Sequence, residues 1–539
     1  MLATLLSSTL AGLDGRVIRV EVDVAPGLPG FAIVGLADAA LQEARERVRG
    51  AIRNAGFVHP PRRITVNLAP ADLRKAGASL DLAIALGILL GSEQVRAAGG
   101  RIGLIGELSL GGDVQPVPGI LPMAAALARR GVQRVVVPAA SVEEARLAGG
   151  IDVVGVGSLR EAADIVRSRR RRGEMALPRR VELDDAGRAA DDGRPENRSI
   201  RADVGLAEAL SGTDPGRPEP VPDLSEVRGQ LEARRALEIA LAGGHGLLLV
   251  GPPGSGKTLL ARTIPGLLPP LGDGEALAAT IVASVAGERP IRALRRDAPV
   301  RTPHHTLSYA AMVGGGPRMS PGEVTLADHG VLFLDELPEF SRDVLEALRQ
   351  PLEDGHVSIS RVGRATTFPA RFQLVAAMNP CPCGMAGDEA NRCTCQHGVP
   401  ERYGARISGP LRDRIDLWVT MPRVPPAALV SGGEPEGSAA VGARIAGARR
   451  VQTARSGVLN SRLSGRRLRA ACKLTRLGEQ RSDQLADLEA LSGRGTERLL
   501  RVARTIADLA GAAAVGVEHL DEASRSRSPS SRPVVRVAG

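Results

Sequence analysis

One segment, Gly251-Pro-Pro-Gly-Ser-Gly-Lys-Thr258, constrains the fold of this chain more than any other. It follows a short apolar run, Gly246-Leu-Leu-Leu-Val250, and a helix is expected to begin at Lys257. A glycine loop between a strand and a helix can surround phosphates with backbone N–H groups, and the helix N-terminus adds positive potential. The sequence therefore predicts an α/β sheet with a nucleotide site at the end of this strand.

Lysine is rare in this chain, which makes its presence in the glycine loop informative. Only three of the 70 basic residues are lysines, and Lys257 is one of them. An ammonium is compact, whereas a guanidinium is a wide planar fork, so a lysine suits contact with the terminal phosphates of ATP. The residues expected around the phosphates are Gly251, Gly254, Ser255, Gly256 and Lys257, and the hydroxyl expected on Mg²⁺ is that of Thr258.

Two further apolar runs end in polar side chains. Gly330-Val-Leu-Phe-Leu-Asp-Glu336 predicts a strand that delivers two carboxylates, Asp335 for the Mg²⁺ shell and Glu336 for the attacking water. An isolated Asp-Glu is usually only a strand end, but its place after a phosphate loop favours catalysis. The strand Phe372–Asn379 ends in an amide that would reach the γ-phosphate if it lies between the other two strands. An Asn before Pro is otherwise an ordinary turn residue.

Composition limits the choice of function without naming one. A chain of 539 residues with 43% hydrophobic content forms two or three domains. The aromatic content of 2% argues against a surface that stacks on bases. The formal charge of +10 permits DNA as a partner, but the arginines are spread along the chain, so a compositional bias explains the charge equally well. With no signal-like start and no membrane-length apolar run, we expect a cytoplasmic protein with reduced or metal-bound cysteines.

The chain divides into three blocks, a linker and a tail. Residues 1–166 alternate strand and helix patterns, whereas residues 167–222 are rich in Asp, Gly and Pro and predict a flexible linker. Residues 223–425 contain the nucleotide motifs. Residues 440–523 predict helices, and residues 524–539 form a Ser/Arg-rich tail that we expect to be disordered.

Four of the five cysteines form two close pairs within a loop rich in Pro and Gly. Nine residues separate the pair Cys381 and Cys383 from the pair Cys393 and Cys395. Four thiolates match a structural Zn²⁺ site in number, although a spacing of one residue within a pair is less typical than two. A reduced loop without metal is an equally weighted alternative.

Several longer strings resemble one known family. They are the phosphate loop, Thr302-Pro-His-His-Thr306, His329–Phe340, Asn379-Pro-Cys-Pro-Cys-Gly384 and Ser408–Asp416. Together they are similar to the Mg-chelatase-like AAA+ ATPases of the YifB/ComM type over nearly the whole chain. The resemblance implies an AAA+ P-loop core with a parallel sheet, a C-terminal helical lid and a hexameric ring. For the ComM type it implies an ATP-driven DNA motor, a branch-migration helicase in recombination or natural transformation that acts on branched or single-stranded DNA.

The same resemblance suggests roles for arginines that are otherwise read as surface ion pairs. Arg414 matches the arginine finger that enters the neighbouring subunit's nucleotide site, with Arg412 as the alternative. Charge supplied in trans raises turnover by roughly 10³ to 10⁵-fold in related chemistry. Arg494 matches the sensor arginine at the start of the last helix, with Arg498 as the alternative.

A second set of positions, also inferred from the family, concerns DNA. Arg301, His304 and His305 belong to an insertion loop that would face the central pore of the ring. There they would contact the DNA backbone.

The first block resembles the Lon-type protease fold. Ser79 matches the position of the nucleophile, but the helix after Gly106–Pro116, which should carry the activating lysine, has none. Lys75 is four residues from Ser79 and is not where the fold keeps its base. Because a serine hydroxyl needs an adjacent base, we expect an inactive protease fold that serves assembly or binding.

Three other functions stay open at this point. A magnesium-chelatase motor subunit is opposed by the first block and the cysteine loop, and an ATP-dependent protease by the missing lysine. The third is a remodelling ATPase with protein clients only.

Overall fold

The computed structural model describes residues 1–35, 39–71, 77–167, 220–316, 319–361, 364–387, 392–424 and 435–526. Most of the predicted linker, Lys75 and residues 527–539 of the predicted tail lie outside these ranges. Among the described residues, no helix combines the length and the hydropathy needed to cross a bilayer.

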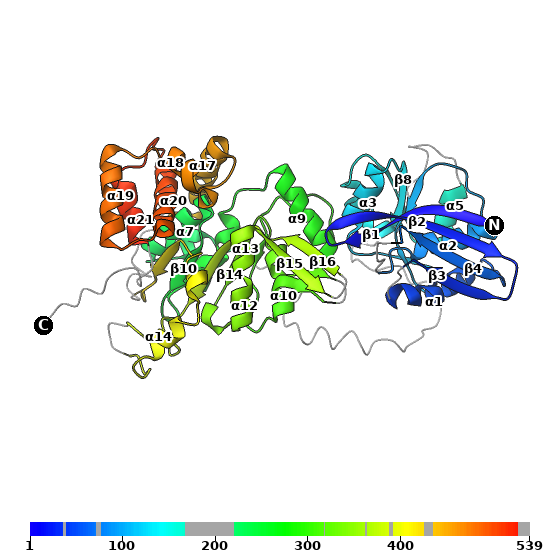
Figure 1. The fold of residues 1–539 in the computed structure, drawn as a ribbon, viewed down its shortest axis with the longest axis horizontal. Helices are drawn as coiled ribbons and strands as arrows, with labels where there is room; N and C mark the ends of the chain where they lie inside the picture. Colours follow the sequence, from blue (N-terminus) through cyan, green and yellow to red (C-terminus); the bar gives the residue numbers. More distant parts are fainter. Residues whose placement is uncertain are drawn as a thin grey trace, which may run out of the picture. The chain divides into compact units, whose positions relative to one another are not determined.

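The amino-terminal domain is a mixed seven-stranded sheet with the strand order β3-β4-β2-β1-β5-β8-β9 (Figure 1). Its strands are β1 (Leu2–Ala11), β2 (Asp14–Ala25), β3 (Gly30–Val34), β4 (Arg63–Ala69), β5 (Ile102–Leu104), β8 (Arg134–Pro138) and β9 (Asp152–Val156). Its main helices are α1 (Ala39–Asn54), α2 (Asp81–Gly91), α3 (Ile120–Arg129), α4 (Val142–Arg146) and α5 (Leu159–Arg167). A small hairpin is formed by β6 (Glu107–Leu108) and β7 (Val114–Gln115).

The predicted periodicities of this domain are confirmed. Val20, Val22 and Val24 alternate into the core along β2, because successive side chains of a strand point to opposite faces. Apart from Asp81 at its start, helix α2 is apolar on every face, and it is buried along almost its whole length, as expected for a helix enclosed on every side.

The second sheet has five parallel strands in the order β11-β14-β17-β10-β18. The strands are β10 (Leu247–Val250), β11 (Val300–Arg301), β14 (Val331–Leu334), β17 (Gln373–Met378) and β18 (Leu417–Thr420). Continuous apolar runs such as that of β17 are typical of parallel strands, which are covered on both faces. The strand before Asn379, β17, lies between β14 and β10, which is the condition under which its amide was expected to reach the γ-phosphate.

Helices and two hairpins surround this sheet. The helices are α7 (Leu231–Gly243), α8 (Lys257–Arg262), α9 (Asp273–Ala286), α10 (Tyr309–Val313), α11 (Glu323–Leu326), α12 (Arg342–Ala347), α13 (Arg349–Asp354), α14 (Val399–Gly404) and α15 (Gly409–Arg412). The hairpins are β12 (Gly314–Gly315) with β13 (Ser320–Pro321), and β15 (His356–Arg361) with β16 (Arg364–Pro369).

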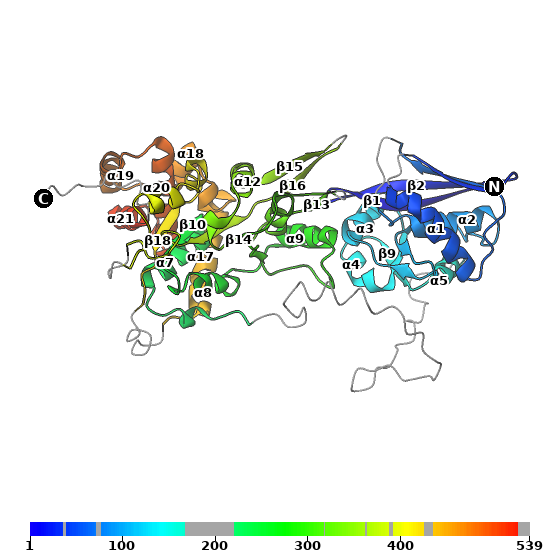
Figure 2. The ribbon, with the colours of Figure 1, turned by 90° about the horizontal axis from the view of Figure 1, so that it is seen from below.

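The carboxyl-terminal region is a bundle of helices, here called the lid. It contains α17 (Ser438–Ser456), α18 (Gly465–Cys472), α19 (Arg476–Leu488), α20 (Gly493–Leu509) and α21 (Val517–Arg525), which gather beside β10 and β18 (Figure 2). Arg494 therefore begins α20 and not the last helix, because α21 follows it. Helix α21 also extends past residue 523, where the lid was predicted to end.

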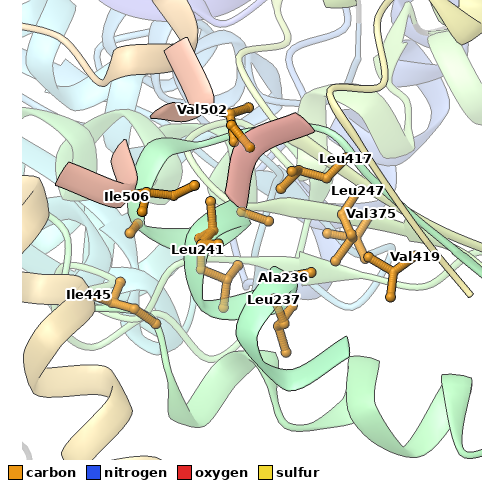
Figure 3. Close-up of a cluster of buried hydrophobic side chains, with 14 of the residues drawn as sticks. Ala236, Leu237, Leu241, Leu247, Val375, Leu417, Val419, Ile445, Val502 and Ile506 are labelled. Atoms are coloured by element: carbon orange, nitrogen blue, oxygen red, sulfur yellow. The ribbon is translucent and has the colours of Figure 1, made fainter. Parts of the chain in front are cut away.

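One hydrophobic cluster joins the lid to the sheet (Figure 3). Leu241 and Leu247 of the core meet Ile445 of α17 and Ile506 of α20 within this cluster. Complete burial of each such side chain contributes about 1.5–3 kcal/mol to stability.

A buried polar chain crosses the same boundary between core and lid. His245 Nδ1 lies 3.1 Å from Asp416 Oδ2, and His245 Nε2 lies 2.8 Å from Thr505 Oγ1 of α20. Burial alone would raise the pKa of the Asp416 carboxyl, but the hydrogen bond with His245 holds this pKa below its usual value. Because buried polar groups are costly unless paired, this chain fixes one orientation of lid against core.

Candidate active site

The phosphate loop has the conformation that its glycines allow. Gly254 and Gly256 have φ values of 77° and 92°, in the left-handed region that glycine adopts without steric cost. A side chain at Gly251 would approach the backbone oxygen of Met421 to 2.3 Å. The glycines therefore let the loop turn tightly between the end of β10 and the start of α8.

Lys257 donates hydrogen bonds to oxygen atoms that follow two strands, β10 and β17. Its Nζ donates to Gly251 O at 2.7 Å, to Pro252 O at 3.0 Å and to Asn379 Oδ1 at 3.2 Å. Burial is the largest influence on the pKa of Lys257 and lowers it, while the charges of Asp335 and Glu336 act in the opposite direction. The structure thus brings together the lysine and the amide that lie 122 residues apart in sequence.

The two carboxylates after β14 face the start of α8. Thr258 Oγ1 donates to Asp335 Oδ2 at 2.6 Å, and the other Asp335 oxygen accepts from Glu336 N at 2.9 Å. A hydroxyl and a carboxylate in contact beside a phosphate loop are the hard oxygen ligands that Mg²⁺ takes together with substrate phosphates. These two residues therefore fit the ion that the sequence predicted for them.

Glu336 has a partner that the sequence did not assign to it. His305 Nδ1 lies 3.5 Å from Glu336 Oε2, and the ring of His305 contacts those of His304 and Phe340, at centroid distances of 4.1 and 6.5 Å. Arg301 pairs with Leu332 in register, so His305 and Glu336, each four residues further on, leave the sheet at the same edge. Strand β11 has only two residues, which is too short to give a recognisable pattern.

Arg301, which was predicted to contact DNA, is instead engaged within the core. Its guanidinium pairs with Glu323 at 2.8 Å and with Glu288 at 3.3 Å. The hydrogen bonds with Glu323 raise its pKa.

The predicted arginine finger is paired with a carboxylate of α13. Arg414 Nη2 pairs with Glu353 Oε2 at 2.7 Å. The hydrogen bond and charge of Arg414, followed by the charges of Arg494 and Arg349, hold the pKa of Glu353 below its usual range. Arg412, by contrast, donates to backbone oxygens of its own segment, including Ile407 O at 3.1 Å.

The alternative sensor, Arg498, contacts the same short segment. Its guanidinium donates to Asp413 O at 3.2 Å and pairs with Asp413 Oδ1 at 3.4 Å. Arg498 thus lies beside the residue that follows α15, and the roles of Arg494 and Arg498 in catalysis stay predictions.

The four clustered cysteines converge as the sequence suggested. Cys381 Sγ lies 3.3 Å from Cys383 Sγ and 3.9 Å from Cys393 Sγ, and Cys383 and Cys393 are 3.6 Å apart. All four sulfurs, including that of Cys395, lie within 4.8 Å of one another. A tetrahedral Zn²⁺ with bonds of about 2.3 Å would place its sulfurs about 3.8 Å apart, so the donor set fits zinc.

One cysteine of this cluster favours the ligand form. Backbone hydrogen bonds from Met385 and Thr394 lower the pKa of Cys383 to about 5. The thiolate is the form that binds a metal, so the lowered pKa of Cys383 agrees with a role as a ligand, whereas the pKa values of Cys393 and Cys395 are raised.

In the amino-terminal domain, Ser79 is buried and its hydroxyl donates to Ser8 O at 3.1 Å. Lys75 lies outside the described residues. The serine hydrogen is therefore committed to a backbone carbonyl.

Comparison with known proteins gives full-length relatives. The family described as magnesium chelatase, subunit ChlI, matches residues 223–429, and related descriptions of the same subunit match residues 20–141 and 435–527. YifB of Escherichia coli is 40% identical over 96% of this chain and 95% of its own length. The competence protein ComM of Haemophilus influenzae is 38% identical over 97% and 96%.

A chloroplast magnesium-chelatase subunit ChlI of Chlamydomonas reinhardtii is a more distant relative. It is 25% identical over 33% of this chain and 48% of its own length. Its similarity covers only part of the chain, whereas YifB and ComM align from end to end. The chain therefore belongs to the YifB/ComM family of Mg-chelatase-like AAA+ ATPases.

Proposed function

We propose that the protein hydrolyses ATP within a hexameric ring in the cytoplasm and uses the energy to migrate DNA branches during recombination or natural transformation. The observation that carries the ATPase is the meeting of Lys257 with Asn379 and of Thr258 with Asp335 at the ends of three consecutive parallel strands, β14, β17 and β10. This edge of a parallel sheet is where such folds bind their ligands. The DNA partner is supported by the competence protein among the full-length relatives.

Each side chain at this edge has a distinct task in our proposal. Lys257 contacts the terminal phosphates, and Asn379, which accepts from it, orients the γ-phosphate and the water. Thr258 and Asp335 hold Mg²⁺, which when bound neutralises phosphate charge. Glu336 polarises the attacking water.

Two arginines complete the site across a subunit boundary in the same proposal. Arg414 is partly exposed and paired with a carboxylate that is itself largely exposed, so it can exchange Glu353 for a partner on another subunit. A planar guanidinium suits a phosphate as well as it suits a carboxylate. Arg494 would act beside it, because both charges reach Glu353.

We propose a structural role for zinc in this machinery. Cys381 follows Asn379 by two residues, so four thiolates on one ion would fix the segment that carries the sensing amide. Metal analysis should find one Zn²⁺ per chain in wild-type protein and none in Cys393→Ser/Cys395→Ser. Equal zinc in the two proteins would assign the ion elsewhere.

The amino-terminal domain is proposed to be a Lon-like fold without protease activity. The support is chemical: Ser79 donates to a backbone carbonyl, and Lys75 is the single lysine of this block. The domain is then left for assembly or for binding a partner.

The experiment that tests the proposed function measures ATP turnover and strand displacement on single-stranded, duplex, forked and four-way DNA. Branched DNA should stimulate turnover most, and Lys257→Ala should abolish both readouts. Turnover that no DNA alters would refute the DNA motor and favour a chelatase-type or protein-remodelling ATPase. That alternative has one specific support, the match of residues 223–429 to the chelatase subunit family.

A further inference from the structure

The charge excess of the chain resides in one stretch. Residues 437–478 contain ten basic residues and no acidic residue. The whole chain has 70 basic and 60 acidic residues, so outside this stretch 60 basic residues are balanced by 60 acidic ones. The net charge of +10 is thus a local property of α17, α18 and the start of α19, and not a general bias toward arginine.

Part of this charge is used to attach the lid to the core and to join helices within the lid. Arg444 pairs with Glu238 of the core at 2.6 Å, and Arg449 donates to Leu241 O of the core at 2.8 Å. Arg455 of α17 pairs with Asp508 of α20, within the lid, at 2.7 Å. These three cations have structural partners. They carry no argument for a ligand.

The cations on and after α18 are different. All five are exposed, and among the described residues none of them forms an ion pair; they are Arg466, Arg467, Arg469, Lys473 and Arg476. The Arg467 guanidinium donates to one backbone oxygen, Ser456 O, at 2.7 Å. We call these five residues the α18 surface.

The helix that carries most of the α18 surface is packed against the rest of the lid. Arg466 and Arg469 are three residues apart, which places them on one face of the helix, and Lys473 follows at the C-cap of α18. The opposite face buries Leu468 and Cys472 in the cluster that joins the lid to the sheet. Figure 1 shows α18 beside α17 and α20 in the lid.

Like charges on one helix face destabilise the helix unless a ligand neutralises them. Four of the five are arginines, whose planar guanidinium binds phosphate oxygens in pairs. Residues 437–478 contain no aromatic side chain, so base stacking is not available there. These features fit a repeating phosphate ligand that is read without regard to base sequence.

We infer that the α18 surface binds the phosphate backbone of DNA. This inference rests on the proposed function for the identity of the polyanion, and it assigns the contact to a place in the lid. Binding there would connect the lid directly to the DNA.

The test compares two triple variants of the full chain that remove the same charge. Arg466→Gln/Arg469→Gln/Lys473→Gln changes the α18 surface, and Arg101→Gln/Arg129→Gln/Arg130→Gln changes three exposed arginines of the amino-terminal domain. Binding of labelled duplex and single-stranded oligonucleotides is measured by fluorescence anisotropy at several salt concentrations. The DNA-free ATPase rate should match wild type in both variants.

Each phosphate contact contributes about 0.9 to the slope of log K against log salt for duplex DNA and about 0.7 for single strands. The α18 variant should therefore lose up to about 2.7 from the duplex slope and about 2.1 from the single-strand slope. The control variant should keep the wild-type slopes.

Equal slopes in the α18 variant and wild type would overturn this inference while leaving the DNA motor intact. Equal losses in the two variants would reduce the effect to net charge and also overturn it. If wild-type protein binds no DNA at any salt, the DNA partner in the proposed function falls as well. Binding of labelled polyglutamate is measured in the same way. If the α18 variant loses polyglutamate binding while its DNA binding is unchanged, the inference is overturned and the surface binds an acidic protein instead.

Discussion

The ATPase core and the amino-terminal domain are both α/β units that place a hydroxyl near the start of a helix, and they use it in opposite ways. In the core, Thr258 donates to Asp335 and lies next to Lys257, whose ammonium reaches a second strand. In the amino-terminal domain, Ser79 donates to a backbone carbonyl. The comparison shows that a fold supplies positions, whereas chemistry needs polar groups from several strands that converge on one point.

The strongest way to break this comparison is to remove the lysine from the core. Lys257→Ala should lose nucleotide binding, because no other cation of the loop can reach the terminal phosphates. Binding of a fluorescent ATP analogue measures the effect. Ser79→Ala is the matched change in the other domain and should leave binding and turnover unaltered.

If wild-type protein cleaves peptides and Ser79→Ala does not, the Ser79 hydroxyl is catalytic and the contrast between the two domains is wrong. That result would show that the hydroxyl of Ser79 has a base after all.

The next largest effect concerns the predicted arginine finger. Arg414→Ala should assemble normally but reduce turnover by roughly 10³-fold or more, because its charge is supplied across the subunit boundary. Turnover of mixed Arg414→Ala and Lys257→Ala protein measures this directly. In a mixed ring, the Arg414→Ala subunit keeps an intact Lys257 and the neighbouring Lys257→Ala subunit keeps an intact Arg414. Sites that combine these two residues should recover part of the activity.

Glu353→Gln is a useful companion, because it removes the carboxylate that pairs with Arg414. Near-normal turnover in this variant would agree with an arginine that leaves Glu353 to act elsewhere. No recovery on mixing the two subunit variants would place Arg414 outside the neighbouring site.

A somewhat smaller loss is expected from the catalytic carboxylate. Glu336→Gln should bind ATP as wild type does but turn it over roughly 10² to 10⁴-fold more slowly, because an amide cannot polarise water as a base does. Single-turnover hydrolysis measures the loss. Normal turnover would remove Glu336 from the assigned role.

The smallest effect should come from His305, the partner that the structure gives to Glu336. The 3.5 Å contact between His305 Nδ1 and Glu336 Oε2 joins two partly exposed groups, and such pairs contribute about 1 kcal/mol or less, so its loss should lower kcat by at most roughly 5-fold, with KM nearly constant. His305→Ala is compared with His304→Ala, which removes a neighbouring ring that does not pair with Glu336. Equal losses in both variants would make the effect one of loop packing.

Much of the site was predictable because its functional residues lie in short contiguous motifs. The phosphate loop, the Asp-Glu pair and the strand before Asn379 each combine an apolar run with a polar end, and in the observed strand order the third strand lies between the other two. The four cysteines converge as their spacing suggested. The identity and the exact roles of the arginines were not predictable to the same degree, because arginine is abundant along the whole chain.

The sequence by itself determined the two α/β patterns, the nucleotide loop and the family, since local periodicity and a contiguous motif need no long-range information. Only the tertiary structure decided that His305 meets Glu336, that Arg414 pairs with Glu353, and that the cations of α18 form no ion pair in the described part of the chain. These relations depend on strand register and on helices that pack from distant segments. Such contacts arise from burial summed over the whole chain, which no short stretch of sequence encodes.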